Sequence, residues 1–127
     1  MTIVFDHPGF KKAISSFFKS DVARNICVVE DGKLLAGCGF SKVKDGKTYA
    51  FLLRLHPAWA SKEFYGALLR FPFEQMGAEQ CVARVGTNQK STRVCERLGG
   101  VKQKDGAFLF EKVKALKDSV EVFGYAE

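Results

Sequence analysis

Two side chains combine a useful pKa with a position at or near the end of an expected element. His56 follows an apolar run that ends at Leu55, and histidine changes charge near neutral pH, so it can accept a proton. Cys95 lies in a short amphipathic segment, and a thiol with a pKa of about 8.5 can donate a proton. Each also has a structural interpretation, because His56 precedes the strand-breaking Pro57 and Cys95 can serve as a packing residue.

The segment that contains the second candidate predicts a strand, a helix and a stop in succession. In residues 80–85, Cys81, Ala83 and Val85 alternate with Val82 and Arg84, which is the two-residue period of a strand. Thr87 or Asn88 can cap the following helix, which we expect over residues 88–98. The glycine pair at 99–100 then ends that helix.

The remaining periodicity predicts a mixed α/β sheet with helices packed on it, in one domain of residues 1–127. The further expected helices are 8–20 and 58–76, and the further expected strands are 25–30, 34–43, 48–55, 101–104 and 107–113. Asp31-Gly32, Asp45-Gly46 and Asp105-Gly106 are hairpin turn signals. Pro72 should kink or shorten the helix that contains it. Residues 114–127 are expected to form a short helix and an arm.

Glycines inside an expected strand indicate where another element comes close. Gly37 and Gly39 both fall within the strand 34–43. A glycine in a strand marks a bulge or a close backbone approach. We expect one of these features there.

This order and spacing resemble the core of the GNAT N-acetyltransferase superfamily. The motif consists of Asn88 at a helix start, Ser91 three residues later and Leu98-Gly99 at the helix end. The resemblance covers residues 24–113 in element order and is motif-level only near residues 88–100. It implies a GNAT-like mixed central sheet flanked by helices, with a shortened N-terminal part. The chain resembles short, divergent members found among tailed-phage proteins.

The resemblance also implies a reaction and a site. Acetyl-CoA would lie between strands 48–55 and 80–86, with the Leu55 N–H polarising the thioester and the helix amides of residues 61–65 holding pyrophosphate. His56 would be the general base, and Cys95 would replace the family tyrosine that protonates the leaving thiolate. The implied cofactor-binding residues are Leu55, Ser61, Lys62, Glu63, Phe64, Tyr65, Asn88 and Ser91.

The expected pyrophosphate loop departs from the family pattern. The Gln/Arg position falls on Ala60, and the two small-residue positions fall on Glu63 and Tyr65. Glu63 would repel the pyrophosphate and Tyr65 would crowd it, whereas Lys62 would partly compensate. Glu63 also has a structural interpretation, because a carboxylate in the first turn favours a helix. Asn88 and Ser91 can likewise act only as a cap and a solvent-facing first turn.

Charge and composition restrict the partners without choosing one. The 127 residues include 20 Lys and Arg against 14 Asp and Glu, a net charge of +6, which favours nucleic acid, a membrane surface or a phosphorylated cofactor. Lys90, Arg93 and Arg97 share a helical face, which either binds nucleic acid or is simply solvated. Twelve phenylalanines indicate an aromatic core or an aromatic surface. Candidates for such a surface are helix 8–20 and the arm with Phe123 and Tyr125.

The four cysteines include no C-x-x-C pair, so we expect no metal site. Without a signal peptide or a long apolar run, we expect a soluble, cytoplasmic protein that does not bind membranes.

Three functions follow from the sequence. The first is an acetyl-CoA-dependent N-acetyltransferase that modifies a small-molecule or protein amine. The second is a catalytically inactive GNAT-like phage virion, assembly or adaptor protein, and the third is a basic nucleic-acid binder. The sequence leaves open a homodimer, a virion partner and a virion location.

Overall fold

The computed structural model describes residues 1–19, 21–59, 61–85 and 89–126. Seven strands in these residues form one sheet in the order β1-β2-β3-β4-β5-β7-β6. The strands are β1 (Thr2–Phe5), β2 (Arg24–Glu30), β3 (Lys33–Phe40), β4 (Lys47–Arg54), β5 (Gln80–Ala83), β6 (Val101–Lys102) and β7 (Phe108–Glu111). The helices are α1 (Pro8–Phe18), the 3-10 turn η1 (Pro57–Trp59), α2 (Lys62–Glu74), α3 (Gln89–Arg97) and α4 (Lys112–Glu121). The expected mixed α/β sheet with flanking helices is confirmed, and β4 and β5 are its parallel pair.

The expected Asp-Gly turns connect the hairpins. Asp31 and Gly32 have φ angles of 50° and 75°, and Asp45 and Gly46 have φ angles of 54° and 74°. Left-handed backbone at both central positions is the geometry that joins twisted antiparallel strands tightly. These turns fix the register of β2, β3 and β4. The last of these strands, β4, is one member of the parallel pair.

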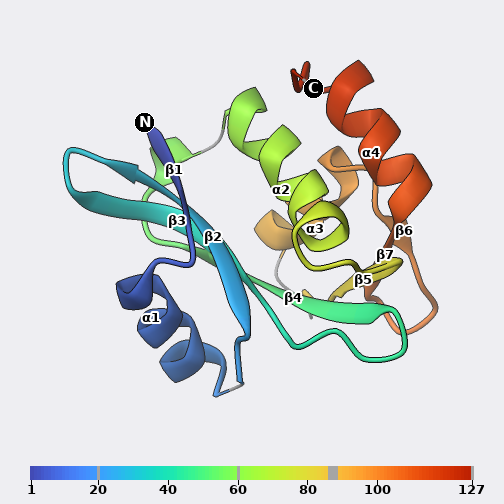
Figure 1. The fold of residues 1–127 in the computed structure, drawn as a ribbon, viewed down its shortest axis with the longest axis horizontal. Coiled ribbons are helices and arrows are strands. Elements are labelled where there is room, and N and C mark those ends of the chain that lie inside the picture. Colours follow the sequence, from blue (N-terminus) through green and yellow to red (C-terminus); the bar gives the residue numbers. More distant parts are fainter. Residues whose placement is uncertain (20, 60, 86–88, 127) are drawn as a thin grey trace.

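One face of the sheet is covered by α1, whose close approach requires two glycines in β3. A Cβ on Gly37 would lie 2.5 Å from the ring of Phe10, and one on Gly39 would lie 2.9 Å from the side chain of Ile14. The close approach expected at these glycines is therefore confirmed. Figure 1 shows α1 on one side of the strands and α2 and α4 on the other.

The expected helix over residues 58–76 is divided in the structure. The short turn η1 comes first and α2 follows it, with Pro72 in the last turn of α2. A proline has no N–H to donate, and α2 ends two residues after it, at Glu74. This agrees with the expected shortening.

On the other face, α2 and α4 are joined through a buried arginine. The side chain of Arg70 is paired with Glu74, 2.5 Å between Nε and Oε1, and its Nη1 donates to Ser119 Oγ at 2.9 Å. Its guanidinium also lies over the ring of Tyr125, 4.7 Å from the centroid. The C-terminal arm is therefore held against α2.

Phe123 was a candidate for an exposed partner surface, and this prediction is wrong. It is only 7% exposed, and its ring packs against Tyr65 with 5.5 Å between the centroids. In contrast, Phe17 at the end of α1 is 68% exposed.

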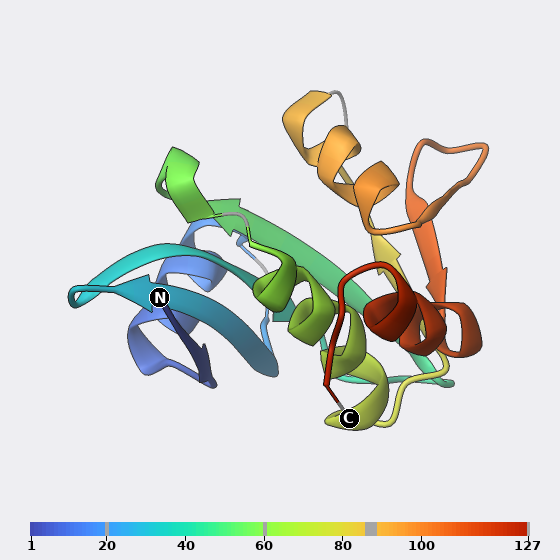
Figure 2. The ribbon, with the colours of Figure 1, turned by 90° about the horizontal axis from the view of Figure 1, so that it is seen from above.

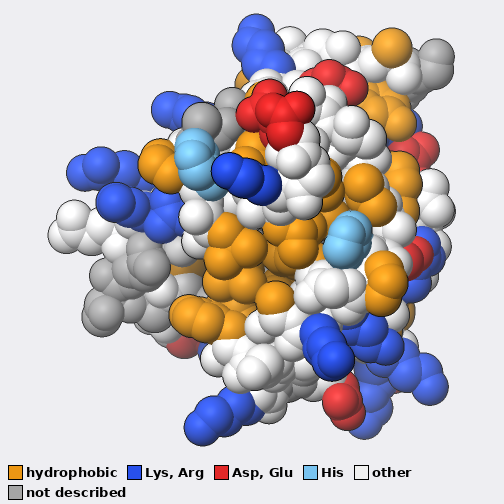
Figure 3. All heavy atoms as spheres, turned by 90° about the vertical axis from the view of Figure 1, so that its left-hand side faces the viewer, with side chains coloured by type: hydrophobic (Ala, Val, Ile, Leu, Met, Phe, Trp, Pro, Cys, Tyr) orange, Lys and Arg blue, Asp and Glu red, His pale blue; other side chains and the backbone are white. Residues whose placement is uncertain are grey.

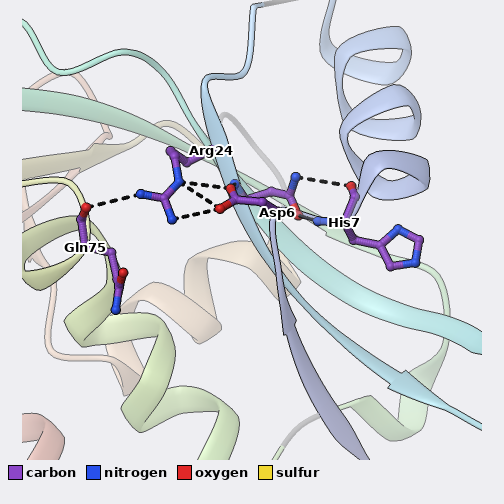
Figure 4. Close-up of polar contacts among 5 residues, drawn as sticks. Asp6, His7, Arg24 and Gln75 are labelled. Carbon is purple, nitrogen blue, oxygen red and sulfur yellow. Dashed lines mark hydrogen bonds and ion pairs between the residues drawn. The ribbon is translucent and has the colours of Figure 1, made fainter.

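A polar network ties the N-terminal strand to the end of α2 (Figure 4). Arg24 pairs with the carboxylate of Asp6, with 2.8 Å between Nη2 and Oδ2, and its Nη1 donates to the carbonyl of Gln75 at 3.2 Å. The hydrogen bond from Arg24 holds the pKa of Asp6 below its ordinary value. This network fixes β1 and β2 relative to α2.

Figure 2 shows α3 and the β6–β7 hairpin together at one end of the sheet, with α1 toward the other end. The parallel pair β4 and β5 lies between these two ends. No helix in the described residues is long and apolar enough to cross a membrane.

Candidate functional site

The sheet opens between its two parallel strands. The pairing of β4 with β5 runs from Lys47↔Gln80 to Ala50↔Ala83, where β5 ends. β4 continues to Arg54 beside β3. The second half of β4 therefore presents an edge with no parallel neighbour among the described residues, and this edge borders the opening.

The backbone groups on that edge belong to Leu52 and Arg54. The N–H of Leu55 donates to the carbonyl of Leu35 on the opposite edge, at 2.8 Å, and the N–H of His56 donates to the same carbonyl at 3.0 Å. Because successive residues of a strand direct their N–H groups to alternate sides, the amides of Leu52 and Arg54 point into the opening. The expected role of the Leu55 amide is corrected, since this amide points away from the opening.

A cavity of about 240 Å³ occupies the opening and passes through the sheet. Phe17, Phe18 and Leu53 line it from the α1 face, and Leu68 and Phe73 line it from the α2 face. Figure 3 shows the hydrophobic surface on the side of α1 and the β2–β3 hairpin, hollowed at its centre and bordered by Lys and Arg side chains. The cavity is therefore lined by side chains from both faces of the sheet.

Four polar groups stand out in the cavity wall. Arg54, Arg84, Ser91 and Cys95 reach it from β4, the end of β5 and α3. No Asp, Glu or His is among the described lining residues. The structure thus brings together Cys95 and Ser91 in the cavity wall. It adds Arg84, which was not predicted from the sequence. The signal that could have indicated Arg84 is a basic residue directly after an apolar strand.

Burial controls the chemistry of Cys95. Its side chain is 5% exposed, and desolvation, followed by the negative charge of Glu96, raises its pKa to about 12. Cys81, which also lines the cavity, has its pKa raised to about 12, mainly by desolvation. Both thiols are therefore protonated and unreactive as nucleophiles at neutral pH.

His56 lies apart from these groups. It follows β4 with an exposed side chain and is not among the described residues that line the cavity. The structure does not bring His56 and Cys95 together.

The N-terminus of α2 is largely occupied by its own cap. The hydroxyl of Ser61 accepts the N–H of Phe64 at 3.1 Å, and the carbonyl of Ser61 accepts the N–H of Tyr65 at 3.0 Å. Lys62 and Glu63 are exposed in the first turn. Two of the amides expected to bind pyrophosphate are therefore already used, and a carboxylate stands beside the others.

Tyr65 was expected to crowd this helix start, but its ring packs inward. It is 5% exposed and meets the ring of Trp59 edge-on, with 5.5 Å between the centroids. Phe64 is fully buried. Asn88, together with Thr87 and Ala60, lies outside the described residues, so its expected contact with the cofactor stays a prediction.

A second, basic pocket adjoins the cavity. Arg54, Lys90, Arg93 and Arg97 line it together with Tyr65 and Val94, and its volume is about 170 Å³. Arg54 comes from the end of β4, and the other three cations come from α3. We call this the α3 basic pocket.

The splayed parallel pair and the helices on both faces define the fold of the GNAT acetyltransferases. The chain has a TM-score of 0.64 and 14% identity to a point variant of the spermidine N-acetyltransferase SpeG from Vibrio cholerae, covering 94% of this chain and 99% of that one. It has a TM-score of 0.51 and 21% identity to an acetyltransferase from Agrobacterium tumefaciens strain C58, covering 78% and 64%. For a GNAT-family acetyltransferase from Bacillus anthracis the values are 0.54 and 13%, covering 71% and 66%.

No family model and no curated protein sequence matches the chain. At the identities given above, the likeness shows the fold.

Proposed function

We propose that the protein is an acetyl-CoA-dependent N-acetyltransferase that acts on an amine. The observation that carries this proposal is the opening between β4 and β5, where two free-edge amides face an apolar cavity that reaches both faces of the sheet. One face can admit an acyl donor while the other admits the acceptor.

The cavity suits the thioester arm of acetyl-CoA, which supplies an acyl group already activated for transfer. In the transfer the amine nitrogen bonds to the carbonyl carbon, the carbon–sulfur bond breaks, and the proton lost by the amine balances the thiolate released. The amides of Leu52 and Arg54 are placed to stabilise an oxygen on which negative charge develops. The apolar walls exclude water, which strengthens that interaction.

Proton transfer has no fixed side chain to serve it among the described lining residues. Burial raises the pKa of Cys95 to about 12, well above that of an ordinary thiol. Donation from Cys95 to a thiolate is therefore unfavourable. Solvent at the open ends of the cavity is the proposed carrier of the proton, and the cavity works chiefly by positioning and electrostatics.

Ala83→Phe tests this function because Ala83 lines the cavity at the last paired position of β5. A phenylalanine there should fill the entry of the opening. We expect the native chain to bind acetyl-CoA by calorimetry and Ala83→Phe to lose binding and transfer to an amine panel. Val113→Phe on α4, at a position 83% exposed, is the matched control, and thermal unfolding confirms that each variant folds. Equal binding by Ala83→Phe and the native chain would contradict the proposal.

A second candidate, an inactive scaffold, is favoured by the occupied start of α2. Ser61 caps the helix and Glu63 places a negative charge there. If the native chain binds no acetyl-CoA and Glu63→Gly gains binding, the cofactor site is closed in the native chain and the scaffold is the better description.

A further inference from the structure

We propose that the phosphate groups of the acyl donor bind in the α3 basic pocket, on Arg54, Lys90, Arg93 and Arg97, and not at the start of α2. This inference rests on the proposed function and adds a binding site to it. It assigns to four side chains the task that the sequence resemblance gave to the backbone amides of residues 61–65.

The apolar cavity and the α3 basic pocket adjoin and share part of their walls. Arg54 and Val94 line both the apolar cavity and the α3 basic pocket. A ligand with an apolar arm and a phosphorylated head can therefore lie in both spaces at once, with Arg54 at the junction. Coenzyme A has this chemical form, because its thioester arm is uncharged and its phosphates are at the other end.

The charge of the α3 basic pocket also favours a phosphate group. None of the four cations forms an ion pair with a described residue, whereas Arg24, Arg70 and Arg84 each pair with a carboxylate. Lys90, Arg93 and Arg97 stand three and four positions apart on one helical face. Like charges at this spacing destabilise a helix unless an anion screens them. A bound phosphate group would relieve that repulsion.

The start of α2 is less suited to a phosphate group than the α3 basic pocket is. The hydroxyl of Ser61 already accepts the N–H of Phe64, and Glu63 adds a carboxylate that repels an anion. Arginine presents planar donors that match phosphate oxygens in pairs, so it binds phosphate well without any help from a helix terminus. Of the two places, the α3 basic pocket offers the favourable charge.

The experiment compares coenzyme A with pantetheine, which has the same arm without phosphates, in Arg93→Gln and Arg97→Gln. Each variant should bind coenzyme A about tenfold more weakly, as expected for the loss of one charge-assisted hydrogen bond. Pantetheine affinity should not change. Lys104→Gln is the control, because Lys104 is an exposed cation that does not line the pocket. The native affinity for coenzyme A should also fall as salt rises, less steeply in the variants.

The outcomes separate this inference from the proposed function. If coenzyme A and pantetheine bind equally well, or the α3 variants bind coenzyme A as the native chain does, the phosphate site is wrong and the proposed function stands. If coenzyme A does not bind but inorganic pyrophosphate binds and is lost in the α3 variants, the anion site stands and the proposed function fails. If none of the three ligands binds, both fail. If an oligonucleotide binds and Lys104→Gln weakens it as much as Arg93→Gln, the inference is overturned in favour of a nucleic-acid surface.

Discussion

At the scale of single residues, Cys95 shows how burial decides the role of a chemically active group. Its position on α3 places it in the cavity wall. The same burial raises its pKa to about 12. A group that holds its proton this tightly is a packing residue with a weak hydrogen-bond donor, and it is poorly suited to proton transfer.

We therefore expect Cys95→Ala to keep its transfer rate within about tenfold of the native rate, because general acid catalysis, whose loss costs about a hundredfold or more, is absent. The measurement is kcat and kcat/KM for acetyl transfer between pH 6 and 9. Cys95→Ser, which keeps a small polar donor, is the companion variant. A hundredfold fall in Cys95→Ala together with recovery in Cys95→Ser would show that the side chain takes part in the chemistry.

The same substitution has a second readout in the pH dependence of stability. In the unfolded chain the thiol ionises above a pKa of about 8.5, whereas in the folded chain its pKa is about 12. Between these values the unfolded chain binds fewer protons, so stability present below pH 8.5 is lost as the pH rises. The free energy of unfolding of Cys95→Ala should decline less steeply between pH 9 and 11 than that of the native chain.

At the scale of elements, the hairpin turns could be predicted from the sequence, whereas the edge of β4 that faces the opening could not. Asp31-Gly32 and Asp45-Gly46 adopt left-handed turns because few other residue pairs do so easily. Which edge of β4 faces the opening depends on the register with β3, set by the turn at Asp45. A shift of one residue exchanges the two edges. The GNAT resemblance assigned the polarising amide to Leu55, whereas the amide that faces the opening is that of Arg54, one position earlier.

The packing of α1 on β3 gives a prediction about stability. Gly37→Ala would place a methyl group 2.5 Å from the ring of Phe10, so we expect a loss of about 1–3 kcal/mol from overpacking. The measurement is chemical unfolding at pH 7. Phe10→Leu combined with Gly37→Ala should lose less than the sum of the two single variants, because the smaller side chain makes room. Strict additivity would mean that the two residues do not press on each other.

At the scale of the whole molecule, the sequence predicted the fold better than it predicted the site. Hydrophobic periodicity and turns are local signals, and they were sufficient for the mixed sheet and its helices. The α3 basic pocket joins Arg54 on β4 with Arg93 and Arg97 on α3, so it exists only once the tertiary structure brings these elements together. Tyr65 and Phe123 also meet only in the folded chain, which is why Phe123 was misjudged as part of a partner surface.

The charge of the cavity leads to a prediction about the acceptor. Arg54 and Arg84 line it and no described carboxylate does, although Asp105 pairs with Arg84 at 3.3 Å and reduces the effect of its charge. A spermidine N-acetyltransferase shares the fold. A second positive charge at 4 Å costs about 4 kcal/mol at the effective dielectric constant of a protein surface. We therefore expect spermidine to be a poor acceptor, at least tenfold below phenethylamine in kcat/KM, because tenfold corresponds to only about 1.4 kcal/mol.

Arg84→Glu provides the decisive comparison, because it reverses one of these charges on an exposed side chain. The variant should raise kcat/KM for spermidine and leave that for phenethylamine nearly unchanged, since phenethylamine carries no second positive charge. Arg84→Gln should fall between the two, as expected for an electrostatic cause. If the native chain prefers spermidine, or if all three proteins treat the two amines alike, the cavity charge does not select the acceptor. In that case the apolar wall around Phe17 and Phe18 would be the feature to change next.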